Sequence, residues 1–271
     1  MRICFLSALI IAGILVTACG GSGASKQKQD AETQEIVEVA VNTLSEAEIA
    51  EGWRLLFDGT TFDGWRGYNR TDMPTAWIIE DDAIKIQGSG RGEAGAKDGG
   101  DIIFDEKFKN FELKFDWKVA EGANSGVFYY IQEIEGQPAY ISAPEYQILD
   151  NENHPDGTLG IDGNRASASL YDMIPAKPQN AKPHGEWNTG AVKINKGSVY
   201  HYQNEELVVE YHLWTPKWQE MLDNSKFSQE AWPLAYDLLL NCGGEDGEGY
   251  FGLQDHGDDV WFRNIRIRIL D

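Results

Sequence analysis

Strict alternation of large apolar and charged side chains over residues 111–119 limits the fold more than any other feature. The apolar positions are Phe111, Leu113, Phe115, Trp117 and Val119, and the charged ones are Glu112, Lys114, Asp116 and Lys118. A period of two is typical of a β-strand with one buried face. The same pattern closes the chain, where Ile265, Ile267 and Ile269 alternate with Arg266 and Arg268. The sequence therefore predicts a sheet packed on a core by one face.

Strand patterns and turn residues fill most of the remaining sequence. A hairpin is predicted at 77–80 and 83–86, and further strands at 126–132, 145–149, 189–195, 198–202 and 206–211. Two short helices are expected, one after the capping box that begins at Ser45 and one after Thr215-Pro216. Many strands, Gly-rich turns and little helical periodicity indicate an all-β fold, a two-sheet antiparallel jelly-roll sandwich. We expect one domain over residues 44–271.

The N-terminal segment reads as an export signal. Arg2 precedes a nearly continuous apolar run from Ile3 to Val16, and Ala18 stands before Cys19. This order predicts a lipoprotein signal peptide at 1–18 and lipidation of Cys19, followed by a flexible tether at 19–43. The alternative, a transmembrane anchor, needs a run of roughly 20 apolar residues, and this run is shorter. We expect an outer-membrane lipoprotein that faces either the periplasm or the cell surface and contacts membrane only through its anchor.

Cysteine use and charge exclude several classes of protein. Cys4 leaves with the signal peptide and Cys19 carries lipid, so Cys242 has no partner for a disulfide in the mature domain. The formal net charge of -21 argues against nucleic acid or anionic membrane as a partner. The sequence also has no Gly-x-Ser-x-Gly elbow, phosphate-binding loop or dinucleotide fingerprint. Serine hydrolase, kinase and nicotinamide-dependent activities are therefore not indicated.

Two polar segments are candidates for a site. Period two places Glu145 and Gln147 on one face of their strand and Ile148 on the other. A carboxylate beside an amide suits sugar hydroxyls, which both donate and accept hydrogen bonds. The strand runs into the loop 150–157, which contains Asp150 and His154 and could equally be an ordinary turn of the Asx type.

Two further features each allow more than one interpretation: His256 with its neighbouring carboxylates, and the charged face of residues 111–119. His256 has Asp255, Asp258 and Asp259 as neighbours, which favours an imidazolium, a loose set of metal ligands or a structural turn. The charged face of 111–119 is either a solvated surface or, if the sheet curves, the floor of a cleft. Tyr129, Tyr130, Tyr140, Tyr171, Tyr200 and Tyr202 offer rings on which a sugar could stack.

The whole region from about Gly52 to Leu270 resembles the 3-keto-disaccharide hydrolase family, formerly a domain of unknown function. The segments that carry the resemblance are 56–59 with Gly64-Trp65, 124–128, 145–150, 170–172, 185–189, 225–227, 252–257 and 261–265. The resemblance implies a concanavalin A-like jelly roll, a secreted or lipoprotein setting, and cleavage of glycosides oxidised at C3. Lys118 and Tyr130 stand where arginine is common in the family, and Gln203-Asn204-Glu205-Glu206 replaces an Asn-Gly turn.

A C3 ketone acidifies the hydrogen on C2, so this substrate calls for elimination of the leaving group and then hydration. Such a reaction needs a base, an acid at the leaving oxygen, and a donor or cation at the ketone oxygen. We expect Glu145 or His154 as the base, with Asp150 orienting His154. Enolate stabilisation is assigned to Lys226 or His256, and substrate binding to Asn124, Gln147, Tyr171 and Gln254. A divalent metal ion is a possible alternative at the ketone oxygen.

Two other functions stay open, a conventional glycoside hydrolase and a non-catalytic carbohydrate-binding domain, because jelly rolls host both. The expected partner molecule is an oligosaccharide or glycoside, with a sugar 3-oxidoreductase to supply the keto group. No cofactor is assigned with certainty.

Overall fold

The computed structural model describes residues 40–92 and 95–271. The predicted signal peptide, Cys19 and all but the last residues of the predicted tether lie outside the described residues. Within them, no helix is both long and apolar enough to cross a membrane.

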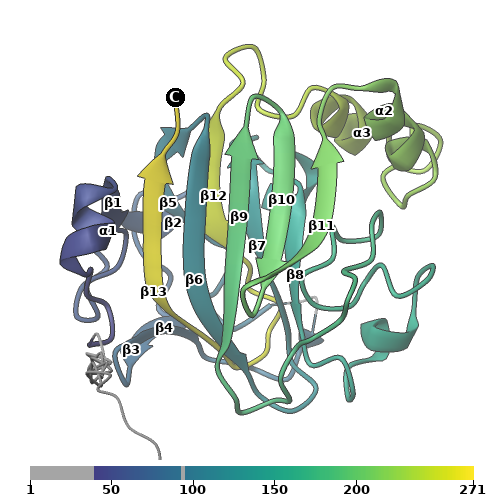
Figure 1. Cartoon of the computed structure of the whole chain (residues 1–271). Helices are drawn as coiled ribbons and strands as arrows, with labels where there is room; N and C mark the ends of the chain where they lie inside the picture. Colours follow the sequence, from purple (N-terminus) through teal and green to yellow (C-terminus); the bar gives the residue numbers. More distant parts are fainter. Residues whose placement is uncertain (1–39, 93–94) are drawn as a thin grey trace, which may run out of the picture. The chain divides into compact units, whose positions relative to one another are not determined.

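Two antiparallel sheets face each other across a shared core (Figure 1). The eight-stranded sheet runs in the order β11 (Glu206–His212), β10 (Ser198–Gln203), β9 (Asn188–Asn195), β6 (Phe111–Val119), β13 (Val260–Ile269), β4 (Ala83–Ile86) and β3 (Trp77–Glu80), with β1 (Trp53–Leu55) also paired to β13. The five-stranded sheet runs in the order β2 (Trp65–Gly67), β5 (Ile102–Phe108), β12 (Gly249–Leu253), β7 (Asn124–Ile131) and β8 (Glu145–Leu149). The prediction of a two-sheet jelly-roll sandwich is confirmed.

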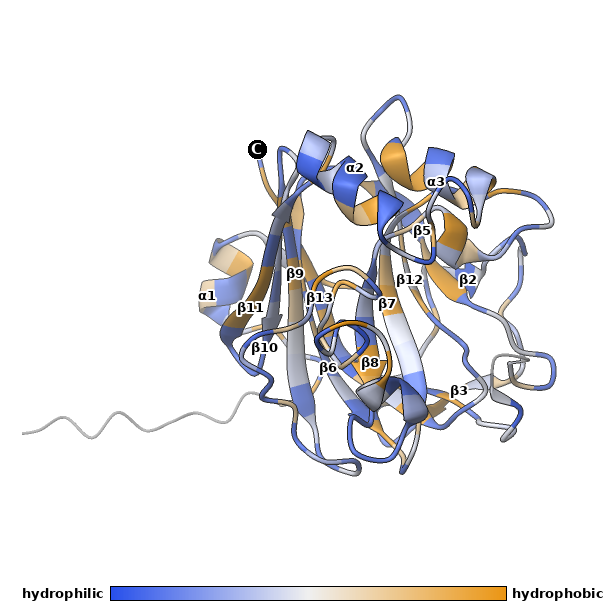
Figure 2. Ribbon diagram, turned by 90° about the vertical axis from the view of Figure 1, so that its right-hand side faces the viewer, coloured by the Kyte–Doolittle hydropathy of each residue, from blue (hydrophilic) through white to orange (hydrophobic). Residues whose placement is uncertain are grey.

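Apolar side chains from both sheets fill the space between them. Figure 2 shows hydrophobic residues, in orange, along strands of both sheets. On β6 the five apolar side chains are buried and the four charged ones are half-buried, which is the alternation that the sequence predicts. Trp117 lies in register with Phe262 of β13, and both are fully buried. A hydrogen bond from the Tyr146 hydroxyl to the Tyr202 carbonyl, 3.1 Å long, joins the two sheets through this core.

Short helices occupy the connections. Both predicted helices are present, α1 (Glu46–Ala50) with its Ser45 capping box and α2 (Pro216–Asp223) capped by Thr215. An unpredicted helix, α3 (Pro233–Leu240), lies near α2 at one end of the sandwich (Figure 2). Two 3-10 turns, η2 (Ala139–Ile141) and η3 (Pro155–Thr158), shape the loops on either side of β8.

The strands predicted from alternation are all present, whereas four others escaped prediction. The missed strands are β1, β2, β5 and β12. Two of them have only three residues, and β5 carries an exposed run in its middle instead of a regular alternation. A period-two alternation cannot be recognised in a strand of three residues or in a strand whose burial does not alternate. Cys242 is a buried free thiol, so the described domain is stabilised by its core.

β8 lies at the edge of its sheet in the strand order, yet all five of its residues are buried. The chain segment 168–171 covers this edge, because Ala168 N donates to Gln147 O at 2.8 Å and Gln147 N donates to Ser169 O at 3.2 Å. Tyr171 N also donates to Glu145 O at 3.2 Å. β8 is thus fixed on both sides, and so are the side chains that it carries.

Candidate active site

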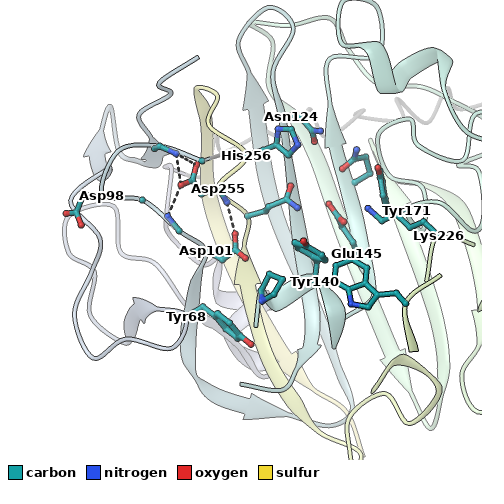
Figure 3. Close-up of a pocket in the computed structure, with 18 residues that line it drawn as sticks. Tyr68, Asp98, Asp101, Asn124, Tyr140, Glu145, Tyr171, Lys226, Asp255 and His256 are labelled. Carbon is teal, nitrogen blue, oxygen red and sulfur yellow. Dashed lines mark hydrogen bonds between the residues drawn. The ribbon is translucent and has the colours of Figure 1, made fainter. Parts of the chain in front are cut away.

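A pocket of about 780 Å³ opens over one end of the five-stranded sheet (Figure 3). Strands β7 and β8, the loop after β12, the loop before β5 and the loop before α3 supply most of its walls. Seven residues assigned from the sequence line it together: Asn124, Glu145, Gln147, Tyr171, Lys226, Gln254 and His256. Residues more than 100 positions apart in the sequence thus lie in one pocket, as they must if they form one site.

Glu145 stands on the pocket side of β8, and Ile148 points into the core, as period two predicts. The carboxyl group occupies space left open by Gly126 of β7, since a Cβ at residue 126 would lie 2.2 Å from Glu145 Oε1. Burial raises the pKa of Glu145 to about 8, against the opposing charges of Lys226 and His256. The Glu145 carboxyl therefore titrates near neutral pH, and its ionised form is a stronger base than an ordinary carboxylate.

Asp101, just before β5, is a second pocket carboxyl that the sequence analysis did not single out. Burial raises its pKa to about 7, although a hydrogen bond from Asp255 N, 3.0 Å long, favours the charged form. Its position follows from Asp255, whose carboxylate accepts hydrogen bonds from Ala96 N and Gly100 N at 2.9 and 2.7 Å. Asp255 therefore organises the loop that carries Asp101.

This arrangement corrects the expectation that Asp255 and Asp259 crowd His256. The Asp255 carboxylate is directed at the 95–100 loop, and a Cβ on Gly99 would lie 2.0 Å from it. Asp259 is 3.4 Å from Lys85 Nζ and accepts a hydrogen bond from Gly88 N. Of the three carboxylates, Asp258 is the one at His256, with 3.6 Å between its Oδ2 and the ring Nδ1.

Three amide side chains hold unused hydrogen-bonding capacity beside these acids. Asn124 Oδ1, Gln254 Oε1 and both terminal atoms of Gln147 are buried and have no partner among the described residues. Buried polar groups in proteins are normally paired, so an unpaired cluster in a pocket indicates a place for a polar ligand. The amides present both donors and acceptors, as hydroxyl groups require.

Lys226 forms the opposite wall with aromatic rings. Its ammonium group lies 4.3 Å from the centroid of the Tyr171 ring and 5.0 Å from that of Phe227. Asp172 fixes this segment by accepting a hydrogen bond from Lys226 N at 2.8 Å. The Tyr171 hydroxyl donates to Asp156 at 3.0 Å, so Tyr171 offers its ring face, and not a free donor, to this site.

His154 and His256 are brought together although they lie on different loops. Their ring centroids are 5.9 Å apart, and with Asp258 they form a group whose ligand atoms all lie within 4.8 Å of one another. His154 Nδ1 accepts a hydrogen bond from Asp156 N at 3.1 Å, which places the proton of the neutral ring on Nε2. A metal ion would require that bond to open, so as it stands the group fits a hydrogen-bonding role better than a metal.

The hydrogen bonds that the structure shows for the Asp150 carboxylate go to groups other than the His154 ring that we expected it to orient, although Asp150 O accepts a hydrogen bond from His154 N at 3.0 Å. Its carboxylate accepts hydrogen bonds from Gly122 N at 2.7 Å and Asn153 Nδ2 at 2.8 Å, and His184 Nδ1 lies 3.5 Å away. Burial raises the pKa of Asp150, but these hydrogen bonds outweigh burial and hold it below its usual value. The Asx-rich sequence after β8 uses this carboxylate to shape its own loop.

The charged face of β6 lies on the eight-stranded sheet, which does not line this pocket. Lys118 sits over the Trp187 and Trp261 rings at 5.0 and 4.5 Å, and Arg263 over Trp187 at 3.9 Å. Asn264 Nδ2 donates to Asp116 at 2.6 Å. Charged and aromatic side chains of this face thus pair with one another. A hollow of about 430 Å³ beside Glu112 and Asp116 is separate from the candidate site.

Comparisons with known proteins agree with the fold and identify the family. Residues 52–268 match the family of 3-keto-alpha-glucoside-1,2-lyase-like domains, so the chain belongs to this family and the resemblance seen in the sequence is confirmed. A protein of Bacteroides thetaiotaomicron named 3-keto-disaccharide hydrolase is 53% identical over 98% of both chains. A crystal structure of a candidate glycosyl hydrolase from Parabacteroides distasonis has 31% identity and a TM-score of 0.72, covering 86% of this chain and 100% of that one. A second from the same organism has 25% identity and a TM-score of 0.61, with coverage of 80% and 99%.

Proposed function

We propose that this protein is an enzyme that cleaves the glycosidic bond of 3-keto-glycosides. The observation that carries the proposal is the buried Glu145 carboxyl, held in the pocket by the space at Gly126 among unpaired amides. Family membership and the name of the Bacteroides relative support the same substrate class.

The reaction follows from the chemistry of a 3-keto sugar. Glu145 removes the proton from C2, and the electron pair moves onto the C3 oxygen as an enolate. When the ketone re-forms, the C1–O bond breaks and the leaving oxygen takes a proton. Water then adds across the C1–C2 double bond, with hydroxyl at C1 and hydrogen at C2, and gives the free 3-keto sugar. The net reaction is hydrolysis.

Glu145 is a better candidate for the base than His154. A carboxylate whose pKa is raised to about 8 is more basic than an ordinary one, and proton transfer is most efficient when the pKa of the base lies near the working pH. The Nδ1 atom of His154 already accepts the Asp156 N–H, and burial lowers the pKa of the ring. We therefore assign His154 as a hydrogen-bond donor through Nε2, and Lys226 as the cation at the ketone oxygen.

Asp101 is the proposed acid at the leaving oxygen. It lies in the same pocket, and its raised pKa of about 7 keeps a proton available near neutral pH. A conventional retaining glycosidase needs one of its two carboxylates ionised as a nucleophile. Asp101 and Glu145, two of the carboxyls that line the pocket, both have raised pKa values, which favours proton transfer over nucleophilic attack by either group.

The test of this function compares two substrates that differ only at C3, where one has a ketone and the other a hydroxyl group. The purified protein is incubated with a 3-keto-glucoside and with its parent glucoside, and release of the aglycone is measured. We expect release from the keto sugar alone. Release from both would indicate a conventional glycosidase, and binding without release would indicate a carbohydrate-binding domain.

Dialysis against a chelator tests the alternative of a metal ion at the ketone oxygen. We expect the activity to survive, since the hydrogen bond from Asp156 N to His154 Nδ1 would have to open before the group of His154, His256 and Asp258 could bind an ion. Loss of activity that a divalent cation restores would move the role proposed for Lys226 to an ion at this group.

The substrate class also implies a partner enzyme and a location. Because ordinary glycosides lack a C3 ketone, we propose that a sugar 3-oxidoreductase supplies the substrate. We also propose export of the chain and lipidation at Cys19. Incorporation of labelled fatty acid into the wild type and not into Cys19→Ser would support this, and equal labelling or none in the wild type would overturn it.

A further inference from the structure

The pocket has two chemically different ends, and Glu145 lies between them (Figure 3). The first end carries Asn124 and His256, and Gln254 is held there by a hydrogen bond from the hydroxyl of Ser125, the neighbour of Asn124, to Gln254 O. The second end carries Tyr68 and Tyr140. Two more lining residues adjoin Tyr140: Trp232, which packs on its ring, and Pro138, which begins its turn. One end is thus rich in amides and the other in rings.

The aromatic end is built from elements that pack on one another. Tyr140 belongs to η2 and Trp232 is the residue just before α3, and their rings meet edge to face with centroids 5.6 Å apart. Phe227, which is almost fully buried, also stacks on Trp232 with a centroid distance of 6.3 Å. Since Trp232 contacts two rings while still lining the pocket, its position is fixed before a ligand arrives.

Size and chemistry indicate what each end holds. A volume of about 780 Å³ is in the range of pockets for ligands much larger than one sugar ring. Unpaired amides match the hydroxyl groups of a sugar, whereas aromatic faces bind the apolar C–H face of a ring by stacking. The bond to be broken must lie beside Glu145, so the two parts of the substrate extend toward opposite ends.

We infer that the aromatic end, formed by Tyr140, Trp232, Tyr68 and Pro138, is the binding subsite for the leaving group, which is a six-membered ring with an apolar face. The keto sugar then occupies the amide end. This inference rests on the proposed function, because it names the leaving group of that reaction. A pyranose and an aryl group share the required chemistry, and their relative rates distinguish them.

The test compares three substrates: a methyl 3-keto-glucoside, a 3-keto-disaccharide and an aryl 3-keto-glucoside. For the wild type we expect kcat/KM to be at least about 10-fold higher with either ring leaving group than with methyl. Trp232→Leu should lower kcat/KM for the ring substrates about 10-fold, mainly through KM, and leave the methyl compound within about twofold. Trp232→Tyr should retain most of the preference because it keeps an aromatic face.

Trp187→Leu is the matched control, since Trp187 pairs with Arg263 on the other sheet and away from this pocket. We expect it to leave the ratio of the three substrates unchanged. Equal losses on all three substrates with Trp232→Leu, or no loss on any, would overturn the leaving-group subsite. Failure of the wild type to cleave any keto-glycoside would instead overturn the proposed function.

Discussion

Two groups of buried polar side chains lie on the two faces of β7, and the structure completes the hydrogen bonds of only one. On the core side, His201 Nε2 is 2.7 Å from the Tyr129 hydroxyl, which is 2.7 Å from the Tyr211 hydroxyl. His201 Nδ1 is 2.9 Å from Ala168 O. On the pocket side, the amides of Asn124 and Gln147 keep buried atoms without partners among the described residues.

We interpret this difference as one between polar groups that stabilise the fold and polar groups that bind a ligand. Burying a polar group without a partner destabilises a fold, so evolution retains such groups where a ligand completes them. The His201 group stabilises the packing of the two sheets, whereas we propose that substrate completes the hydrogen bonds of the pocket group. Variants on the core side of β7 should therefore lose stability, and variants on the pocket side should lose activity.

Glu145→Gln should produce the largest effect and should act on activity alone. Loss of the base lowers kcat about 100-fold or more. The Gln variant should be at least as stable as the wild type at pH 8, because the raised pKa means that ionisation of Glu145 opposes folding. Steady-state kinetics with a 3-keto-glucoside and urea unfolding measure the two properties.

The pH dependence of Glu145 gives this variant a second readout. The folded pKa of about 8 exceeds the usual value of 4.5, so the folded protein keeps a proton that the unfolded chain has lost. The unfolding free energy of the wild type, relative to that of Glu145→Gln, should fall by about 1 kcal/mol per pH unit as pH rises from 4.5 to 8. A constant difference over that range would contradict the raised pKa.

His201→Phe should show the opposite behaviour. It removes the partner of Ala168 O and one of the two partners of the Tyr129 hydroxyl, so we expect unfolding free energy to fall by about 2 to 4 kcal/mol. The kcat of the folded fraction should change little. A loss of kcat comparable to that of Glu145→Gln, at unchanged stability, would show that the core group also serves catalysis.

His201 also predicts how the wild type responds to acid. Burial lowers its pKa to about 4 from 6.5, so the folded protein holds the ring neutral while the unfolded chain takes up a proton. The stability that this group provides is complete above pH 6.5 and should decline as pH falls toward 4. His201→Phe should show a shallower decline in the same urea experiment.

Gly126→Ala should lower activity by moving the Glu145 carboxyl. The new methyl group would lie 2.2 Å from Glu145 Oε1 and displace the carboxyl, so we expect kcat/KM to fall about 10-fold or more. Gly190→Ala is the matched control, because its Cβ would lie 2.5 Å from the Phe115 ring in the core. It should lower stability and leave the kcat of the folded protein unchanged. Equal kinetic losses in both variants would argue against a specific role for Gly126.

Tyr211→Phe should have the smallest effect. It removes one hydroxyl from the end of the core group while the ring stays packed on Trp218, with centroids 5.6 Å apart. A loss of about 1 kcal/mol in unfolding free energy is expected, with unchanged kinetics. A loss as large as that of His201→Phe would mean that the group is one cooperative network.

The alternation of apolar and polar residues with a period of two gave most of the correct predictions from the sequence. It identified β6, β8 and β13 and placed Glu145 and Gln147 on one face, because regular strands alternate whatever surrounds them. Asp101 was missed because it precedes β5, a strand without regular alternation. The error over Asp255 has a similar cause, since sequence neighbours do not reveal that the glycines of the 95–100 loop fold around its carboxylate.

Contacts between distant loops were beyond the sequence patterns. His154 and His256 each stood in a plausible polar turn, and only the folding of β8 and β12 into one sheet brings their rings together. The partner of Asp150 was predicted from proximity along the chain, but His184, on a separate loop, lies beside it instead. The aromatic end of the pocket depends on α3, which gave no recognisable periodic signal before the structure was known.

The covered edge of β8 has a consequence for how this protein behaves among copies of itself. An uncovered outer strand is a template on which a second chain can add its own strand. Here Ala168 and Tyr171 already occupy the backbone groups that such a neighbour would use. The strand that carries Glu145 is therefore closed to intermolecular pairing, and many molecules can crowd together without joining through the part of the sheet that carries the proposed base.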